Sequence, residues 1–320
     1  MRIETGVTRL LGIDLPIIQA GMSWASSCSA LPLAVSRAGG LGVIAAGPMR
    51  REDLLRAIEE VRGGTDLPFA VNLPLYRAGA DAVMDCLVER RIPVLIASQG
   101  GPKRYLDRFK AVGTTCIHVV AGEEHAQKAA GAGVDALVVV GGEAGGHPPA
   151  ELVSTLVVVR AVARTLAGRL PIIASGGFAD GTGLAAALAL GAGAANFGTR
   201  FIATPEASVH AAYKRAVLDA PIAGTRTVGR GFGMIRMLDN AFAARMQAME
   251  LAGAPVDDRK AVFAGSSLKQ AAFDGDMAEG KVEAGQSAGL VDDLVPAGEL
   301  VRRIAREYCA AIAGLPRPAA

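Results

Sequence analysis

Short apolar segments alternate with amphipathic segments along the first two thirds of the chain. Eight apolar segments have the length and the Val, Ile, Leu and Ala content of buried strands: residues 16–19, 41–46, 69–73, 94–98, 116–120, 136–140, 172–175 and 194–197. Most start about 20 to 30 residues after the previous one, which is the period of a strand–helix unit. Strands that are apolar on both faces are typical of a parallel sheet covered by helices. The pattern therefore predicts an α/β fold, a (β/α)8 TIM barrel rather than an open, doubly wound sheet.

Helix-forming segments fill the connections between these strands. We expect helices over residues 30–38, 51–61, 123–132 and 183–190, and glycines follow the first two of them at 39–40 and 63–64. Glycine just after a helical pattern is a stop signal because it adopts the left-handed conformation that ends many helices. The connections are thus predicted to be helices.

About 120 residues follow the eighth predicted strand, more than one closing helix needs. We expect helices over 204–220 and 238–251, a loop rich in glycine and arginine over 224–233, and short helical pieces over 260–289. Residues 297–312 form an amphipathic pattern that suits the final helix of a barrel.

This excess predicts a smaller helical domain inserted near the C-terminus. We expect a cofactor-binding barrel over residues 1–222, a helical lid that holds the substrate over 223–276, and a return to the barrel with the last helix over 277–320.

Charge and cysteine usage exclude several classes of function. The net charge is +2 with acids and bases interspersed, so no nucleic-acid or membrane surface is indicated. Cys28, Cys86, Cys116 and Cys309 lack the spacing of a zinc site or a disulfide framework, and no His, Asp or Glu cluster suggests another metal. The N-terminus lacks the pattern of a signal peptide, and charges interrupt every long apolar run. We therefore expect a cytoplasmic protein.

Glycines follow the last two predicted strands. The seventh strand ends in Ser175, Gly176 and Gly177, and the eighth is followed by Gly198 and Thr199. Barrels commonly bind a phosphate at this position, where backbone N–H groups reach the anion without a Cβ in the way. Each glycine taken alone also fits a turn or a close helix packing; two such clusters on neighbouring strands favour a phosphate site.

His147 closes a glycine-rich loop after the sixth strand. Gly145 and Gly146 precede it and two prolines follow, which places the ring in a rigid loop at the catalytic face. We predict a catalytic role for His147 over a purely structural one. His118 lies within the fifth strand and is expected in the core, whereas His125 and His210 lie on predicted helices at the surface.

Residues after the first, third and fourth strands suit a planar ligand. Ala20, Gly21 and Met22 follow the first strand and offer close backbone approach and apolar contact. The amides of Asn72 and Gln99 are placed to hydrogen-bond the edge of a heteroaromatic ring. Together with a phosphate site these features describe FMN, and no GxGxxG fingerprint for a dinucleotide follows the first strand.

Four stretches of the chain carry a resemblance to a known family: residues 16–24 (PIIQAGMSW), 142–147 (GEAGGH), 173–181 (IASGGFADG) and 198–201 (GTRF). The chain resembles the nitronate monooxygenases, formerly called 2-nitropropane dioxygenases, a family that also includes FMN-dependent enoyl-acyl-carrier-protein reductases. Residues 284–290 (AGQSAGL) resemble the segment in which the family's lid returns to the barrel. The resemblance implies a barrel with non-covalent FMN, a helical domain over the flavin, and His147 as the active-site histidine.

The chain departs from the family pattern at two positions. Ala20 stands where relatives often have a second glycine, and Val119 stands where the NADH:quinone reductase branch has lysine. The missing lysine disfavours quinone reduction and leaves monooxygenase and enoyl reductase unresolved.

We favour an FMN-dependent nitronate monooxygenase, which oxidises an alkyl nitronate with O2 to a carbonyl compound and nitrite. His147 would hold the anionic nitronate or take the α-proton of a nitroalkane. A small apolar substrate would suit the lid side chains Phe232, Met234, Met237 and Phe242, which could equally be lid core. The partners implied are small molecules and O2, with a homodimer left open.

Two alternatives remain. An NAD(P)H-dependent enoyl-thioester reductase would need basic residues to meet phosphates, and candidates are Arg226, Arg230 and Arg236, although these also suit a solvated loop. A flavin-binding protein without turnover is disfavoured, because it would not need His147.

Overall fold

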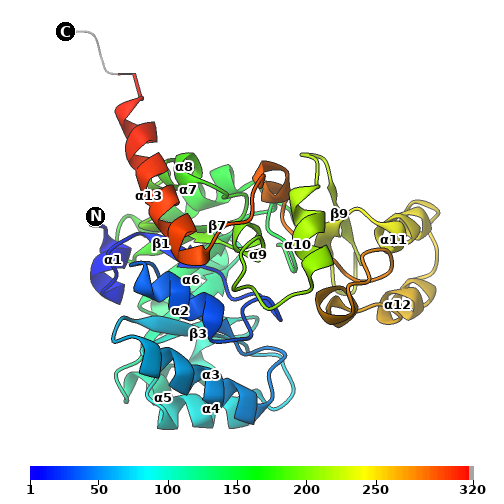
Figure 1. The fold of residues 1–320 in the computed structure, drawn as a ribbon. Helices are drawn as coiled ribbons and strands as arrows, with labels where there is room; N and C mark the ends of the chain where they lie inside the picture. Colours follow the sequence, from blue (N-terminus) through cyan, green and yellow to red (C-terminus); the bar gives the residue numbers. More distant parts are fainter. Residues whose placement is uncertain (317–320) are drawn as a thin grey trace.

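The computed structural model describes residues 1–316, and a closed barrel of eight parallel strands dominates it (Figure 1). The strands are β1 (Ile17–Gln19), β2 (Gly42–Ala45), β3 (Phe69–Pro74), β4 (Val94–Ser98), β5 (Thr115–Val120), β6 (Ala136–Val140), β7 (Ile172–Ser175) and β8 (Ala194–Phe197). They follow one another around the sheet, β1 pairs with β8, and a parallel bridge between Ile18 and Leu41 joins β1 to β2. The predicted TIM barrel is confirmed, because each apolar run is a strand within two residues of its predicted ends.

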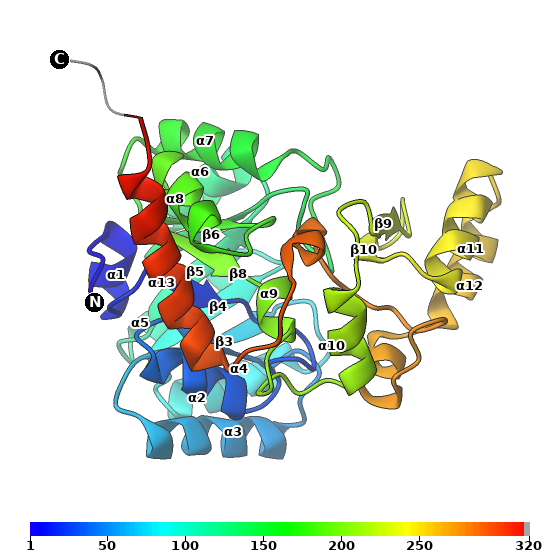
Figure 2. The ribbon, with the colours of Figure 1, turned by 45° about the horizontal axis from the view of Figure 1, so that its top comes forward.

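Helices cover the outside of the barrel (Figure 2). They are α2 (Ala30–Arg37), α3 (Arg51–Gly64), α4 (Ala80–Glu89), α5 (Leu106–Lys110), α6 (Glu123–Ala132), α7 (Thr155–Leu166) and α8 (Gly181–Ala189), with a 3-10 turn η1 (Pro102–Arg104) before α5. The short helix α1 (Gly6–Leu11) instead packs Val7 and Leu11 against the residues inside the barrel. Alternate strand residues separate two cores: Val43 belongs to a cluster with Ile18 and Ile117, whereas Ile44 packs in the larger cluster that includes Leu54 and Ile58 of α3. This double burial explains why the strands are apolar on both faces.

The last helix, α13 (Ala297–Ala313), lies between α8 and α2 (Figures 1 and 2). Leu300, Val301 and Ile304 of α13 are buried. Its Glu307 accepts a hydrogen bond from the Gly181 N–H at 2.9 Å, at the first turn of α8. A Cβ at Gly181 would clash with the α13 backbone, so the glycine permits this close packing.

The elements after β8 differ from the prediction in three places. They are α9 (Thr199–Ile202), α10 (Ala211–Leu218), β9 (Thr225–Val228), β10 (Ile235–Leu238), α11 (Ala241–Leu251), α12 (Val256–Ala264), the π-turn η2 (Gln270–Asp274) and the 3-10 turn η3 (Gln286–Leu290). The helix predicted over 204–220 starts only at 211, the one predicted over 238–251 starts at 241, and the predicted loop 224–233 contains β9. The loop prediction was wrong because β9 pairs with β10 across the glycines, with Val228 opposite Ile235.

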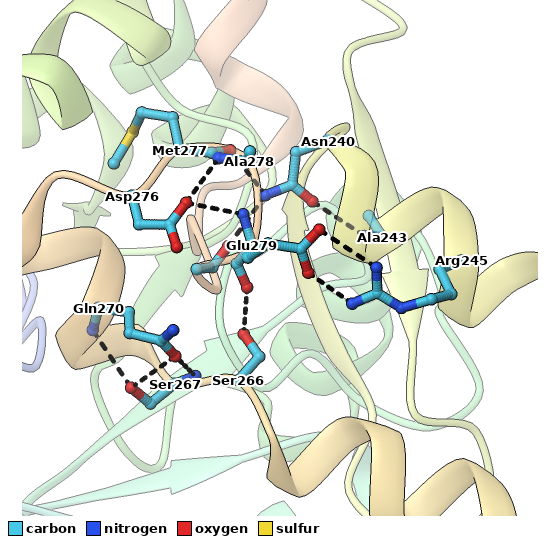
Figure 3. Close-up of polar contacts among 11 residues, drawn as sticks. Asn240, Ala243, Arg245, Ser266, Ser267, Gln270, Asp276, Met277, Ala278 and Glu279 are labelled. Atoms are coloured by element: carbon cyan, nitrogen blue, oxygen red, sulfur yellow. Dashed lines mark hydrogen bonds and ion pairs between the residues drawn. The ribbon is translucent and has the colours of Figure 1, made fainter.

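The lid elements form their own hydrogen-bonded unit beside the barrel mouth (Figures 2 and 3). Asn240 caps α11 by accepting from the Ala243 N–H at 2.9 Å, and its amide donates to the Met277 and Gly280 carbonyls at 2.9 Å each. Arg245 of α11 pairs with Glu279. The segment before η3 is therefore tied to the lid. The domain boundaries at 222/223 and 276/277 stay predictions.

Candidate active site

One cavity of about 840 Å³ lies where the carboxyl ends of the strands meet the lid and the 282–287 segment. Every residue predicted from the sequence to form the site lines it: Ala20, Gly21, Met22, Asn72, Gln99, Gly145, His147, Ser175, Gly176, Gly177, Gly198 and Thr199. Strand order explains this convergence, since the carboxyl ends of a parallel barrel all face one side. Their roles toward a ligand stay predictions.

The ends of β7 and β8 form a cradle of free donors. Gly176 and Gly177 have φ angles of +110° and +82°, which only glycine adopts readily. Within residues 1–316 the N–H groups of Gly176, Gly177 and Gly198 have no hydrogen-bond acceptor. A Cβ on Gly198 would meet no atom closer than 3.7 Å, so open space lies beside it. Clustered free N–H groups of this kind bind anions.

Two hydroxyls and one amide complete the cradle. The Ser175 hydroxyl accepts a hydrogen bond from the Asn196 amide at 3.0 Å, and the Thr199 hydroxyl accepts from the Gly285 N–H at 2.8 Å, so both protons are free for a ligand. The Asn196 Oδ1 is buried without a partner among the described residues. Sequence reasoning missed Asn196, although a polar side chain inside the apolar run of β8 was a usable signal. A buried unpaired oxygen is costly unless a ligand hydroxyl or N–H reaches it.

The opposite side of the cavity carries the two predicted amides. Asn72 donates to the Ile96 carbonyl at 3.0 Å, which fixes its amide. The backbone of Gln99 has a φ of +56°, which is uncommon for residues other than glycine and is enriched at functional sites. A Cβ on Gly21 would lie 2.5 Å from the Asn72 Cβ. Gly21 is therefore required for packing whatever it does for a ligand.

The loop that carries His147 is clamped by the lid. Gly146 and Arg236 of β10 form an antiparallel bridge. The buried Arg236 guanidinium also donates to the Gly142 carbonyl at 2.9 and 3.2 Å. On the other side, the Ala284–Gly285 backbone packs so closely on Gly145 that a Cβ there would clash. Gly145 thus has a packing reason besides any ligand contact.

His147 is exposed and lines the cavity. Partial desolvation by the surrounding protein, with the nearby Lys281 charge, lowers the pKa of His147 below its ordinary value. The ring is therefore neutral at pH 7. A neutral imidazole suits proton abstraction or hydrogen bonding better than charge-assisted binding of an anion.

The other histidines agree with the sequence analysis. His118 is buried, and its Nδ1 lies 2.9 Å from the Tyr105 hydroxyl, so the ring belongs to the barrel core although one edge reaches the cavity. Burial lowers the pKa of His118. His125 and His210 are exposed, and His210 caps α10 by accepting from the Ala212 N–H.

Two titratable residues just before the 284–290 segment, Lys281 and Glu283, were not predicted from the sequence. Glu283 lines the cavity, and burial raises its pKa to about 7. Lys281 lies over the Phe263 ring, 3.4 Å from the centroid, and burial lowers its pKa to about 8 while Glu283 opposes the shift. No local motif signals them, because the lid places them beside His147 from far along the chain.

Most lid residues considered for the substrate do not reach the cavity. Met234 lines it, but Met237 and Phe242 are buried in the lid core and Phe232 packs edge-on against Phe263. The proposed basic pocket is not formed either, since the three arginines have other partners: Arg226 pairs with Asp239, Arg230 lies exposed near Glu250, and Arg236 binds Gly142.

A sequence model described as nitronate monooxygenase matches residues 4–89 and 79–307. The chain belongs to the nitronate monooxygenase family. It is 33% identical to the (3aS,4S,5R,7aS)-5-hydroxy-7a-methyl-1-oxo-octahydro-1H-indene-4-carboxyl-CoA dehydrogenase of Mycobacterium tuberculosis, over 95% of this chain and 96% of that relative. It is 34% identical to a nitronate monooxygenase of Paraburkholderia phytofirmans, over 93% of each.

Solved structures agree with this membership. The structure of FabK from Thermotoga maritima superimposes with a TM-score of 0.90 at 40% identity, covering 97% of this chain and 98% of that one. As a member of the nitronate monooxygenase family the protein is an enzyme, a flavin-dependent oxidoreductase. Within residues 1–316 no helix has the length and apolar character to cross a bilayer.

Proposed function

We propose that this nitronate monooxygenase family protein binds FMN and oxidises alkyl nitronates with O2 to carbonyl compounds and nitrite. The observation that supports FMN best is the cradle at Gly176, Gly177 and Gly198, whose free N–H donors suit a terminal phosphate. The Ser175 and Thr199 hydroxyls would donate to the same phosphate. Bound FMN would supply the electron transfer between substrate and oxygen.

The remaining polar groups suit the rest of the cofactor. Asn196 Oδ1, which lacks a partner among the described residues, would accept from a ribityl hydroxyl beyond the phosphate. Asn72 and Gln99, across the cavity, would hydrogen-bond the polar edge of the ring, and Met22 would contact its face. Each part of FMN thus has a chemically matching residue.

His147 would carry the proton chemistry. Because its pKa is lowered, the neutral ring would accept the α-proton of a nitroalkane or hydrogen-bond a nitronate oxygen through its N–H. Arg236 would hold the loop so that the ring stays at the substrate. On the lid side the cavity is lined by apolar Met234 and Leu268, which suits a small alkyl group and offers no arginine for a nucleotide.

A second candidate is an FMN-dependent NAD(P)H enoyl-thioester reductase. Two observations favour it: the cavity of about 840 Å³ is large for FMN plus a nitroalkane, and the M. tuberculosis relative is named as a CoA-ester dehydrogenase. In this reaction His147 would donate a proton to the α-carbon of the thioester.

Anaerobic mixing separates the two. The purified yellow protein would be titrated under argon with 2-nitropropane nitronate, and separately with NADH and NADPH, while absorbance near 450 nm is followed. Bleaching by the nitronate but not by the nucleotides supports the monooxygenase. Bleaching by NADH or NADPH but not by the nitronate supports the reductase instead. If the purified protein holds FAD instead of FMN, the cofactor assignment is contradicted.

A further inference from the structure

The segment that returns from the lid to the barrel brings a carboxylate into the cavity. Glu283 bridges Met237 of β10 in antiparallel fashion, and its backbone carbonyl accepts from the Tyr213 hydroxyl at 2.6 Å. The side chain lies against the loop that carries His147, because a methyl group on Gly146 would sit 3.1 Å from the Glu283 Oε2. Its position is therefore fixed on both sides.

This carboxylate has no partner in the protein. Within residues 1–316 its oxygens make no hydrogen bond and no salt bridge, whereas the neighbouring Glu143 accepts from both the N–H and the hydroxyl of Thr155. A largely desolvated carboxyl without a partner is costly, and such groups gather at functional sites. Its free oxygens face the space that a substrate would fill.

We propose that Glu283 contacts the substrate and selects it by charge. In its neutral form the carboxyl donates a hydrogen bond to a substrate oxygen; in its ionised form it repels an anionic substrate. This inference rests on the proposed function, because it places the substrate in the same cavity as FMN, and it adds that the site admits uncharged substrates at every pH and nitronate anions only when Glu283 is protonated.

Among the groups around it, Glu283 is the one whose pKa lies nearest to neutral pH. Burial raises the pKa of Glu283 to about 7, and the nearby Lys281 charge opposes this shift only in part. Desolvation lowers the pKa of His147 below its ordinary value, and the pKa of Tyr213 is raised well above its usual value. The Lys281 ammonium, with a pKa of about 8, loses its charge only at the upper end of the range.

Two further charges near Glu283 are already engaged. Arg236 of β10 donates to the Gly142 carbonyl, and Glu143 of the His147 loop is bound by Thr155. Among the described residues Arg236 makes no ion pair with Glu283, and Glu143, itself an acid, cannot neutralise it. The charge on Glu283 thus decides between anionic and neutral ligands around pH 7.

The test is the pH dependence of ligand binding to the FMN-loaded protein between pH 6 and 8, measured by calorimetry. Isobutyrate, which has the shape of 2-nitropropane and the charge of its nitronate, is compared with isobutyramide, its neutral counterpart. For the wild type the Kd of isobutyrate should rise about tenfold from pH 6 to pH 8, following ionisation of one group. The Kd of isobutyramide should stay constant.

In Glu283→Gln the Kd of isobutyrate should rise by no more than about twofold from pH 6 to pH 8, a change that loss of the Lys281 charge can cause. At pH 8 this variant should bind isobutyrate about tenfold more tightly than wild type. Glu283→Asp should restore the pH dependence, and Glu283→Met serves if the glutamine variant does not fold. The matched control is Glu279→Gln, four residues away in the same segment, whose carboxylate pairs with Arg245 outside the cavity and which should behave as wild type (Figure 3).

A tenfold rise that persists in Glu283→Gln, or a flat profile in the wild type, would overturn the inference. Calorimetry does not depend on turnover, so these outcomes stand whether or not the protein releases nitrite. Failure of the proposed function would appear separately, as absence of nitrite with the binding profile intact.

Discussion

Arg236 in β10 and Gly146 in the loop after β6 exchange two backbone hydrogen bonds, with N···O distances of 2.7 and 3.0 Å. The same arginine anchors Gly142 through its side chain, so one lid residue grips both ends of the loop that presents His147. The lid therefore does more than cover the barrel mouth, because it fixes the loop that carries His147, the proposed catalytic residue.

Arg236→Met should lower kcat without removing the flavin. The variant leaves the Gly142 carbonyl without its donor and frees the loop, and a displacement of about 1 Å at a reacting group costs on the order of 10²-fold in rate. The cradle at Gly176, Gly177 and Gly198 lies on other strands and should keep its FMN. Steady-state kinetics and the flavin-to-protein absorbance ratio measure the two effects.

The control for this variant is Arg230→Met, which removes an exposed arginine from the same hairpin. It should retain wild-type kcat. An Arg236→Met enzyme with full activity would show that the loop holds His147 without the lid.

His147→Asn should retain FMN and lose turnover of neutral nitroalkanes. Proton transfer by a positioned side chain contributes about 10²–10⁴ in rate, and asparagine can hydrogen-bond but cannot take a proton at neutral pH. His125→Asn, an exposed histidine at the outer part of the cavity, is the matched comparison and should lose little. Near-normal turnover by the His147 variant with full flavin occupancy would make the ring structural.

Gly177→Ala should weaken FMN binding by about tenfold or more. The φ of +82° strains any residue with a Cβ, by roughly 1 kcal/mol, and the strain falls on the N–H group aimed at the phosphate. Gly231→Ala, at a φ of +89° in the lid hairpin, carries a comparable strain away from the cavity. Fluorescence titration of apoprotein with FMN should separate them; equal FMN affinities would argue against the cradle.

Glu283→Gln should stabilise the fold at alkaline pH. The pKa of Glu283 is raised from 4.5 to about 7, so the native state binds more protons than the unfolded state between these values. The contribution of this group to the free energy of unfolding is therefore largest below pH 4.5, falls as the pH rises toward 7 and stays constant above pH 7. The glutamine variant should gain up to about 3 kcal/mol over wild type between pH 5 and pH 8. Urea unfolding at both pH values measures it, and a constant difference would contradict the raised pKa.

The sequence located the barrel well because each strand is buried on both faces and appears as an uninterrupted apolar run. It failed in the lid, where β9 is half-polar and short, and where its pairing with β10 depends on residues across a glycine turn. The glycine-rich strand ends were recognisable because they lie next to their strands. Glu283 was not recognised as part of the site, and Arg236 was considered only for a phosphate-binding pocket, since their contacts with Gly146 and Gly142 join segments far apart in the sequence.

Nitrite release in air tests the proposed reaction directly. The FMN-loaded protein would be incubated with 2-nitropropane nitronate or propionate 3-nitronate, with no nucleotide present, and nitrite and the carbonyl product would be assayed. A nitronate carries its own electrons and needs no proton removed, so nitrite should form in step with oxygen uptake, whereas His147→Asn should lose turnover of the neutral nitroalkane. No nitrite, together with rapid NADH or NADPH oxidation driven by a short enoyl thioester, would contradict it.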